Sequence, residues 1–327
     1  MVGLRRSMKR ILVGMLFSLC LTGLFGCSDE TYHPSGETLF LSEGTDTFHI
    51  STGAVLEIPD TDPFARAPHV LRVDFLNTGE SDAILLRAED WTCLVDTGEA
   101  DDFGRIAWAL DSYRITSLNC LILTHFDNDH IGSAAQILRK YAVERVYMPD
   151  YVRDSVTYRR MVSALELLSD TEVHCVTEDT VVEIPNGQLR INPTKLYEAG
   201  ITLGSDDEHA LEENNFSLIT SVKFGEIDLL LPGDAEQERL VEFLDRGESA
   251  DYDLIKIPHH GKYDKALGNL LRESEELRYC VIHAGAAAHV EASLTTAVRS
   301  TGAAAYYTYG GDVHFATDGV SMIVEQD

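Results

Sequence analysis

Basic residues are scarce in this 327-residue sequence: 26 lysines and arginines stand against 54 aspartates and glutamates, and the formal net charge is −28. The shortage argues against a general nucleic-acid coat or an electrostatic membrane binder, because both need a basic surface. An anionic substrate would have to be held locally, for example by metal ions. Hydrophobic residues make up 44% of the sequence, which excludes wholesale disorder.

Long apolar runs are also missing after the first 27 residues, so no later segment approaches the length of a membrane span. Near the start, four basic residues precede an apolar stretch, 11–25, that ends in Leu-Phe-Gly-Cys27. This end resembles a bacterial lipobox, although its Phe is bulkier than usual. We expect residues 1–26 to be a lipoprotein signal peptide and Cys27 to carry the lipid. The protein would then be exported to the bacterial cell envelope and anchored to the membrane by that lipid only; an ordinary secretory signal or an uncleaved anchor is the alternative.

Closely spaced cysteines are lacking too, and no Cys-x-x-Cys pair occurs. The four cysteines after Cys27 are Cys93, Cys120, Cys175 and Cys280, and most lie in apolar, strand-like surroundings. We expect buried free thiols, with disulfides in an exported protein as the alternative.

The rest of the chain divides by composition into two parts. Residues 27–69 are acidic and rich in Ser, Thr, Gly and Pro, which predicts a tether; whether it folds stays open. Residues 70–327 are expected to form one domain. Strands are predicted at 70–75, 83–87, 92–95, 120–123, 145–148, 217–224, 228–231, 254–257, 279–283 and 304–308. Helices are predicted at 104–113, 131–141, 155–168, 235–246, 265–273 and 292–300. Early hairpins followed by alternating strands and helices favour a layered α/β domain over an all-parallel sheet.

The densest group of polar side chains follows the apolar run 120–123. It comprises His125, Asp127, Asp129 and His130, in one turn between a strand and a helix. Imidazole and carboxylate groups are the usual ligands of divalent metal ions. Four such groups within six residues exceed what one ion needs from one loop, so the spacing predicts a metal site rather than a solvated turn.

Two more strands are expected to end in ligand-type residues. The leucines 229–231 predict a buried strand that delivers Asp234 just before a helix; alone, such an aspartate would more often cap the helix. The run 254–257 predicts a strand that ends at His259 and His260, where Gly261 permits close backbone approach. Each of these two motifs is weak alone, but together with the motif at 125–130 they make three strands that end in ligand-type residues, which indicates a metal centre.

Two further residues are weaker candidates. Asp96 follows the predicted strand 92–95, and we expect it to support the metal ligands from behind. Asn214 precedes the strand at 217–224, where it either lines the site or caps a turn.

These motifs, with the segments 75–83, 95–98 and 214–218, resemble the metallo-β-lactamase superfamily and occur in its order. Within it, residues 70–327 are most similar to the C-terminal nuclease-like domain of ComEC-type DNA-internalisation competence proteins. The resemblance implies an α/β fold, the four-layer αββα sandwich. Asp127 stands where the superfamily usually has the second His of His-x-His-x-Asp-His, as in that subgroup. The chain departs from the subgroup at Asn77, Ser81 and Lys262, where Asp, Gly and Ser are usual.

The ligands that the resemblance implies come from all three strand ends. They are His125, Asp127, Asp129, His130, Asp234 and one of His259 and His260, of which we favour His260. Asn214 falls near a motif in which hydrolases of the family more often have His. His289 resembles a subgroup histidine and is expected to touch the substrate.

The ligand set predicts two divalent ions, Zn or Mn, roughly 3.5–4 Å apart and sharing a hydroxide of lowered pKa. Asp234 would bridge them, and Asp129 would hold one ion and orient the hydroxide. The non-ligand member of the pair His259/His260 would protonate the leaving group. Three carboxylates against three imidazoles suit Mn²⁺ as well as or better than Zn²⁺.

The favoured function is a metal-dependent phosphodiesterase or nuclease-like hydrolase with a small-molecule or phosphodiester substrate. One alternative is an ester, thioester or lactam hydrolase of the same fold, and another is a non-catalytic surface binding lipoprotein. The acidic charge does not support nucleic acid as the substrate, and the sequence lacks the transmembrane part of the competence proteins. The oligomeric state stays open.

Overall fold

The structure is a computed structural model that describes residues 40–41, 47–49, 55–57, 64, 67–196, 202–203, 210–247 and 251–327. The chain divides into two compact units, Met1–Arg66 and Ala67–Asp327. In the first unit, a three-stranded sheet has the order β1 (Phe40–Leu41), β2 (Thr47–His49) and β3 (Val55–Glu57). The predicted signal peptide 1–26 and Cys27 lie outside the described residues.

Two large sheets make up the centre of the second unit. The eight-stranded sheet has the order β20 (Met322–Gln326), β19 (Val313–Thr317), β4 (Leu71–Phe75), β5 (Ile84–Ala88), β6 (Trp91–Val95), β7 (Ser117–Ile122), β8 (Ala142–Pro149) and β9 (Glu172–Val176). The seven-stranded sheet has the order β10 (Thr180–Ile184), β11 (Gly187–Asn192), β14 (Ile219–Phe224), β15 (Ile227–Leu231), β16 (Leu254–Lys256), β17 (Tyr279–Ile282) and β18 (Ala304–Tyr307). A separate parallel pair joins β12 (Thr202–Leu203) and β13 (Ala210–Leu211).

The sheets pack face to face, and alternation along each strand decides which side chains lie between them. In β15, Leu229 and Leu231 point into the core between the sheets, whereas Leu230 points outward to a core shared with helices. A strand buried on both faces reads as a continuous apolar run, which is why three successive leucines occur here.

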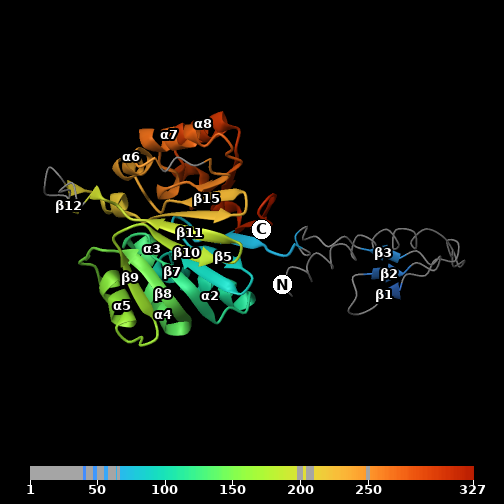
Figure 1. Ribbon diagram of the computed structural model, residues 1–327, viewed down its shortest axis with the longest axis horizontal. Coiled ribbons are helices and arrows are strands. Elements are labelled where there is room, and N and C mark those ends of the chain that lie inside the picture. Colours follow the sequence, from blue (N-terminus) through green and yellow to red (C-terminus); the bar gives the residue numbers. More distant parts are fainter. Residues whose placement is uncertain are drawn as a thin grey trace, which may run out of the picture. The chain divides into compact units, whose positions relative to one another are not determined.

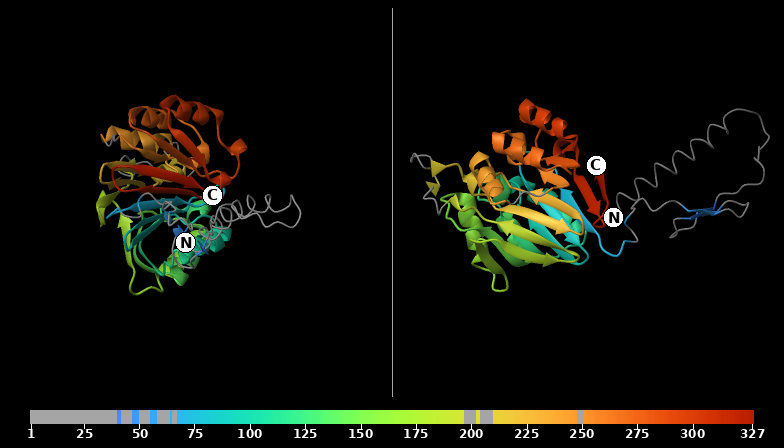
Figure 2. Two further views of the ribbon diagram at one scale, coloured as in Figure 1. Left: turned by 90° about the vertical axis from the view of Figure 1, so that its right-hand side faces the viewer. Right: turned by 45° about the horizontal axis from the view of Figure 1, so that its top comes forward.

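Helices cover the outer face of each sheet. On the eight-stranded sheet lie α2 (Phe103–Ser112), α3 (Asn128–Ile131), α4 (Ala134–Lys140) and α5 (Val156–Leu165), and on the seven-stranded sheet lie α6 (Gln237–Asp245), α7 (Lys265–Glu273) and α8 (Ala292–Thr301). Figure 1 shows α6, α7 and α8 above the sheets and α2, α4 and α5 below them, and the turned views in Figure 2 keep this order. The predicted four-layer αββα sandwich in a single domain is confirmed.

Every strand and helix predicted between residues 70 and 327 has a counterpart in the structure. The helix predicted at 131–141 is replaced by α3 and α4, which are separated by Gly132 and Ser133. Five longer strands were not predicted: β9, β10, β11, β19 and β20. Among the described helices, none is long and apolar enough to cross a membrane.

The four cysteines of the described part are all free thiols. Cys93, Cys120 and Cys280 are buried, as predicted. The prediction of a buried thiol was wrong for Cys175, which is exposed. Its strand, β9, forms the edge of the eight-stranded sheet, and four of its five residues are exposed.

Parallel pairing brings the loops of interest to one edge of the sandwich. Strands β6, β7, β8 and β9 are parallel neighbours, as are β15, β16, β17 and β18. The loops after β6, β7, β15 and β16 carry the polar motifs found in the sequence, so the topology gathers them at the carboxyl ends of both sets of strands.

Candidate metal centre

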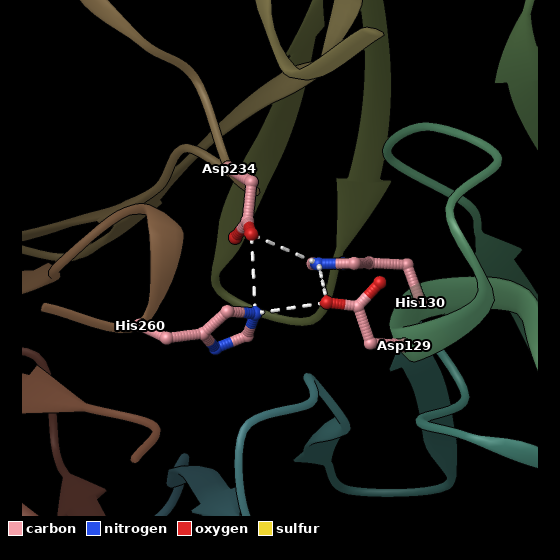
Figure 3. A group of neighbouring side chains, drawn as sticks. All are labelled: Asp129, His130, Asp234 and His260. Atoms are coloured by element: carbon pink, nitrogen blue, oxygen red, sulfur yellow. Dashed lines mark hydrogen bonds and ion pairs between the residues drawn. The ribbon is translucent and has the colours of Figure 1, made fainter. Parts of the chain in front are cut away.

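Four side chains from three loops converge at this edge. Asp129 and His130 belong to the short helix α3 after β7, Asp234 follows β15, and His260 follows β16. His260 Nε2 lies 3.2 Å from Asp129 Oδ2 and 3.1 Å from Asp234 Oδ2. His130 Nε2 lies 3.3 Å from Asp234 Oδ2 and 3.9 Å from Asp129 Oδ2. Figure 3 shows the four side chains pointing toward one another, and their ligand atoms all lie within 4.8 Å of each other.

The chemistry of this four-residue cluster fits a divalent cation. Two carboxylate oxygens and two imidazole nitrogens face one point, which is a donor set typical of Zn²⁺ and Mn²⁺. His130 Nε2 is buried and has no hydrogen-bond partner, although a carboxylate oxygen is nearby. Because buried polar atoms are nearly always satisfied in folded proteins, an orphaned nitrogen aimed at two carboxylates indicates an ion-binding position.

Asp96 fixes the orientation of His130 from behind. Its Oδ2 lies 2.7 Å from His130 Nδ1, and it also accepts hydrogen bonds from the backbone N–H (2.8 Å) and the hydroxyl (2.7 Å) of Thr124. A carboxylate on Nδ1 keeps the proton there and leaves Nε2 free to bind a metal. The sequence predicted a supporting role for Asp96, and this geometry supports it.

A close backbone approach lets Asp234 reach the cluster. Gly233 has φ +59°, and a Cβ at this position would lie 2.8 Å from Thr124 Cβ in the loop that carries His125. Only glycine avoids this clash in a left-handed conformation, so the two loops can touch.

His125 and Asp127 form a pair beside the four-residue cluster. His125 Nε2 is buried, has no hydrogen-bond partner and lies 3.5 Å from Asp127 Oδ2. The rings of His125 and His130 are 4.1 Å apart between centroids. The second oxygen of Asp127, Oδ1, lies 2.5 Å from Arg153 Nη1, and Arg153 also forms an ion pair with Glu213. One imidazole and one carboxylate oxygen are therefore available for a second ion.

The structure separates the two neighbouring histidines. His260 joins the four-residue cluster, whereas His259 Nδ1 lies 2.8 Å from Glu236 Oε1 and its Nε2 lies 2.6 Å from Lys262 Nζ. Asn214 is beside His259, with its amide nitrogen 3.4 Å from each ring nitrogen. His260 is thus in position to bind an ion together with Asp129 and Asp234, and His259 is not.

His289 lies farther along the same edge. It is half-exposed on the loop after β17 and forms an ion pair with Glu80 in the loop between β4 and β5. Within the residues that the structure describes, His289 does not join the four-residue cluster.

Electrostatics favour ionised carboxylates in the cluster. Burial alone would raise the pKa of Asp234, but His260, Lys256 and His130 outweigh it and hold that pKa well below the usual range. Asp129 behaves likewise: burial opposes ionisation, yet its hydrogen bond to His260 and the charge of His130 lower the pKa to about 2. The carboxylates in turn raise the pKa of His260 to about 9 despite burial. Metal binding therefore competes with protons on the imidazoles.

Three buried polar residues of the site were missed in the sequence. Asp82, Lys256 and His283 are all buried directly behind the cluster. Lys256 was not predicted as a site residue, although a charged side chain inside the apolar run 254–257 was a signal of one. His283 directly follows the apolar strand β17, but it stands alone there without neighbouring ligand-type residues.

The fold and this site define a class of protein. Two stacked sheets between helical layers, with histidines and aspartates at one edge, are the architecture of metal-dependent hydrolases of the αββα type. The family model described as "Metallo-beta-lactamase superfamily" matches residues 76–280, and the chain belongs to that superfamily. The predicted family resemblance is thereby confirmed.

Similar proteins include one curated relative and several solved structures. ComE operon protein 3 of Bacillus subtilis (strain 168) is 25% identical over 208 residues, which cover 58% of this chain and 25% of that protein. This chain therefore spans about a quarter of the length of that relative. The metallo-beta-lactamase fold protein YhfI from Bacillus subtilis is 13% identical, with 73% of this chain and 96% of that chain covered and a TM-score of 0.48. Zn(2+)-bound PqqB from Methylobacterium extorquens is 12% identical, with 69% and 85% covered and a TM-score of 0.47.

Proposed function

We propose that this protein is a metal-dependent phosphodiesterase of the bacterial cell envelope, with a nuclease-like site. The observation that carries the proposal is the four-residue cluster of Asp129, His130, Asp234 and His260, whose donor atoms all face one point. These residues would hold one divalent ion, Zn²⁺ or Mn²⁺. His125 and Asp127 would hold a second ion, with Asp234 shared between the two positions.

Bound divalent ions would supply a nucleophile at neutral pH and polarise a phosphoryl oxygen. The chain's own residues fix the geometry: Asp96 orients His130, and Asp129 would orient the nucleophile. His259 is held by Glu236 on one side and faces Lys262 on the other. We assign His259 the transfer of a proton to the leaving oxygen, for which a positioned imidazole is suited.

Local charge favours a phosphodiester over a neutral ester. Arg153 lies beside Asp127 and Lys262 lies beside His259, so a cationic side chain stands next to each of these two residues. Such groups stabilise the anionic oxygens of a phosphoryl group. The net charge of −28 opposes a long polyanion, which favours a small or short phosphodiester over an extended nucleic acid.

The place of action follows from the N-terminal sequence. A basic segment, an apolar stretch and Leu-Phe-Gly-Cys27 support export and lipidation at Cys27. The lipid would be the protein's membrane attachment, with the second unit free to meet substrates outside the cytoplasm.

A substrate panel tests the reaction class. Full-length protein in detergent, supplied with Mn²⁺ or Zn²⁺, is given bis-p-nitrophenyl phosphate, p-nitrophenyl phosphate, p-nitrophenyl acetate and a chromogenic β-lactam, beside Asp234→Asn. We expect turnover of the diester above the other three, and its loss in the variant. Preferential turnover of the acetate or the lactam would replace the proposal with an ester or lactam hydrolase of the same fold. No turnover of any substrate would favour a binding protein.

A further inference from the structure

A layer of buried charge lies directly behind the four-residue cluster. Asp82 comes from the loop between β4 and β5, Lys256 ends β16, and His283 comes directly after β17. All three side chains are at most 1% exposed. The backbone ties this layer to the cluster, because the N–H of Asp82 donates to the carbonyl of Asp129 at 3.1 Å.

Lys256 uses its ammonium group entirely within this layer. Its Nζ donates to the carbonyl of Gly233 at 2.9 Å and to Asp234 Oδ1 at 3.0 Å, and it forms an ion pair with Asp82. An ammonium group has three donors, and all three have partners here. A fully buried lysine is costly unless it is paired in this way, so its position is tightly specified.

These contacts decide which oxygen Asp234 presents to an ion. Its Oδ1 accepts from Lys256 and, at 3.1 Å, from the backbone N–H of His259. Its Oδ2 is left to face His130 and His260. Asp234 therefore cannot rotate about its last torsion without losing two hydrogen bonds.

Asp82 acts on the opposite side of the same layer. Its Oδ2 is paired with Lys256, and its Oδ1 lies 3.2 Å from His283 Nδ1 and 3.9 Å from His260 Nδ1. Asp82 Oδ1, His260 Nδ1 and both ring nitrogens of His283 are buried without a hydrogen-bond partner. Burial lowers the pKa of His283 to about 4, so this ring is neutral at neutral pH. Asp82 thus lies behind His260 without a hydrogen bond to it, whereas Asp96 is within hydrogen-bond distance of His130.

From this geometry we infer that Asp82 and Lys256 are positioning residues of the metal centre. Lys256 holds Asp234 so that Oδ2 faces the ion position, and Asp82 holds Lys256 in place. The inference rests on the proposed metal site and adds an internal ion pair whose loss weakens metal binding without removing a ligand.

The test removes the pair while conserving the net charge. The double variant Asp82→Asn/Lys256→Met loses one negative and one positive group, and all the proposed metal ligands remain. Its matched control is Asp253→Asn/Arg278→Met, which removes the ion pair between Asp253 and Arg278 at the other end of β16. Metal affinity is measured by chelator competition with Zn²⁺ and Mn²⁺, the Co²⁺ absorption spectrum reports ligand geometry, and melting in chelator reports the fold.

We expect the double variant to bind metal about 10–100-fold more weakly than the wild type, with an altered Co²⁺ spectrum. The control is expected to keep wild-type affinity even if its melting temperature falls. Affinity within twofold of wild type and an unchanged Co²⁺ spectrum in a folded double variant would overturn the inference. If the double variant does not fold, the nearly isosteric Asp82→Asn carries the same expectation. Failure of the wild type itself to bind metal would instead count against the proposed function.

Discussion

His259 and His260 are adjacent in sequence but contact different partners. Both have left-handed backbone conformations, with φ of 49° and 52°, and their rings lie 6.4 Å apart at an angle of 81°. The sequence placed both at the end of a strand but could not assign their directions, because two successive positive φ values are rare for residues other than glycine. The structure directs His260 to the four-residue cluster and His259 to Glu236.

A partly buried ion pair away from this site is expected to give the fold a pH dependence. Asp74 Oδ1 lies 2.7 Å from His314 Nδ1, and Arg87 Nη2 lies 2.7 Å from Asp74 Oδ2. Burial lowers the pKa of His314, but Asp74 outweighs it and raises that pKa above its usual value. Burial raises the pKa of Asp74, and His314 and Arg87 together bring it below its usual value.

The sign of each shift sets the pH window. The raised pKa of His314 stabilises the fold below its unfolded value of about 6.5, and this contribution is lost as pH rises through the folded value. The lowered pKa of Asp74 stabilises the fold above about 3.9, and this is lost as pH falls through the folded value. We predict that His314→Ala lowers the free energy of unfolding by about 1–2 kcal/mol near pH 5.5 and by less near pH 9, measured by urea denaturation.

Asp74→Asn supplies the control for this prediction. In that background the nearest partner charge is gone and only the weaker influence of Asp327, 3.6 Å from His314 Nε2, remains, so His314→Ala is expected to lose most of its pH dependence. An equal loss of stability at both pH values in the wild-type background would show that His314 contributes by packing alone.

The loops between strands and helices carry the site, and glycine decides how closely two of them approach. We predict that Gly233→Ala lowers the free energy of unfolding by at least about 2 kcal/mol, because it adds a clash with Thr124 to the cost of a left-handed alanine. Gly302→Ala, at the end of α8, is the matched control: φ there is +83°, but nothing lies within 4 Å of the added Cβ. It is expected to cost only about 1 kcal/mol in thermal unfolding.

Metal affinity separates the two glycine variants further. Gly233 precedes Asp234, so Gly233→Ala is also expected to weaken metal binding, whereas Gly302→Ala is not. Equal melting temperatures for the two variants would contradict the close approach of the loops.

The elements that the sequence predicted are those with an apolar face or an apolar run. Strand β15 and helix α7 are examples, and the bounds of α7 were predicted to the residue. Strand β9 was missed because it is an exposed edge strand with no buried face to pattern its sequence. Strands β10 and β11 form a hairpin whose turn residues are Pro185 and Asn186, and both residue types favour turns.

The residues of the candidate site also fall into a predicted group and a missed group. Residues of the densest motif, such as His125 and Asp129, were predicted because several ligand types stand close together. Asp82, Lys256 and His283 meet only through tertiary packing of three distant segments. No spacing rule links such positions, so their contact could not be read from the sequence alone.

At the level of the whole chain, the acidic composition and the N-terminal segment bear on where the protein acts. We predict that wild-type protein expressed in a bacterial host with a lipoprotein pathway is found in the membrane fraction, and that Cys27→Ser moves it to the soluble exported fraction or leaves it as an unprocessed precursor. Cys175→Ser changes an exposed cysteine of the second unit and is the control. Fractionation followed by immunoblotting measures the distribution. A wild-type protein that is wholly soluble would contradict the lipid anchor.

The central claim is that Asp129, His130, Asp234 and His260 form a divalent-metal centre. It is tested most directly by stripping the full-length protein with a chelator, dialysing it against Zn²⁺ or Mn²⁺, and measuring bound metal for the wild type, His260→Ala and His259→Ala. We predict at least one ion per wild-type chain, a loss of roughly 100-fold or more in affinity for His260→Ala, and near-wild-type binding for His259→Ala. A wild type that binds no ion, or a His260→Ala variant that binds as tightly as the wild type, would contradict the account.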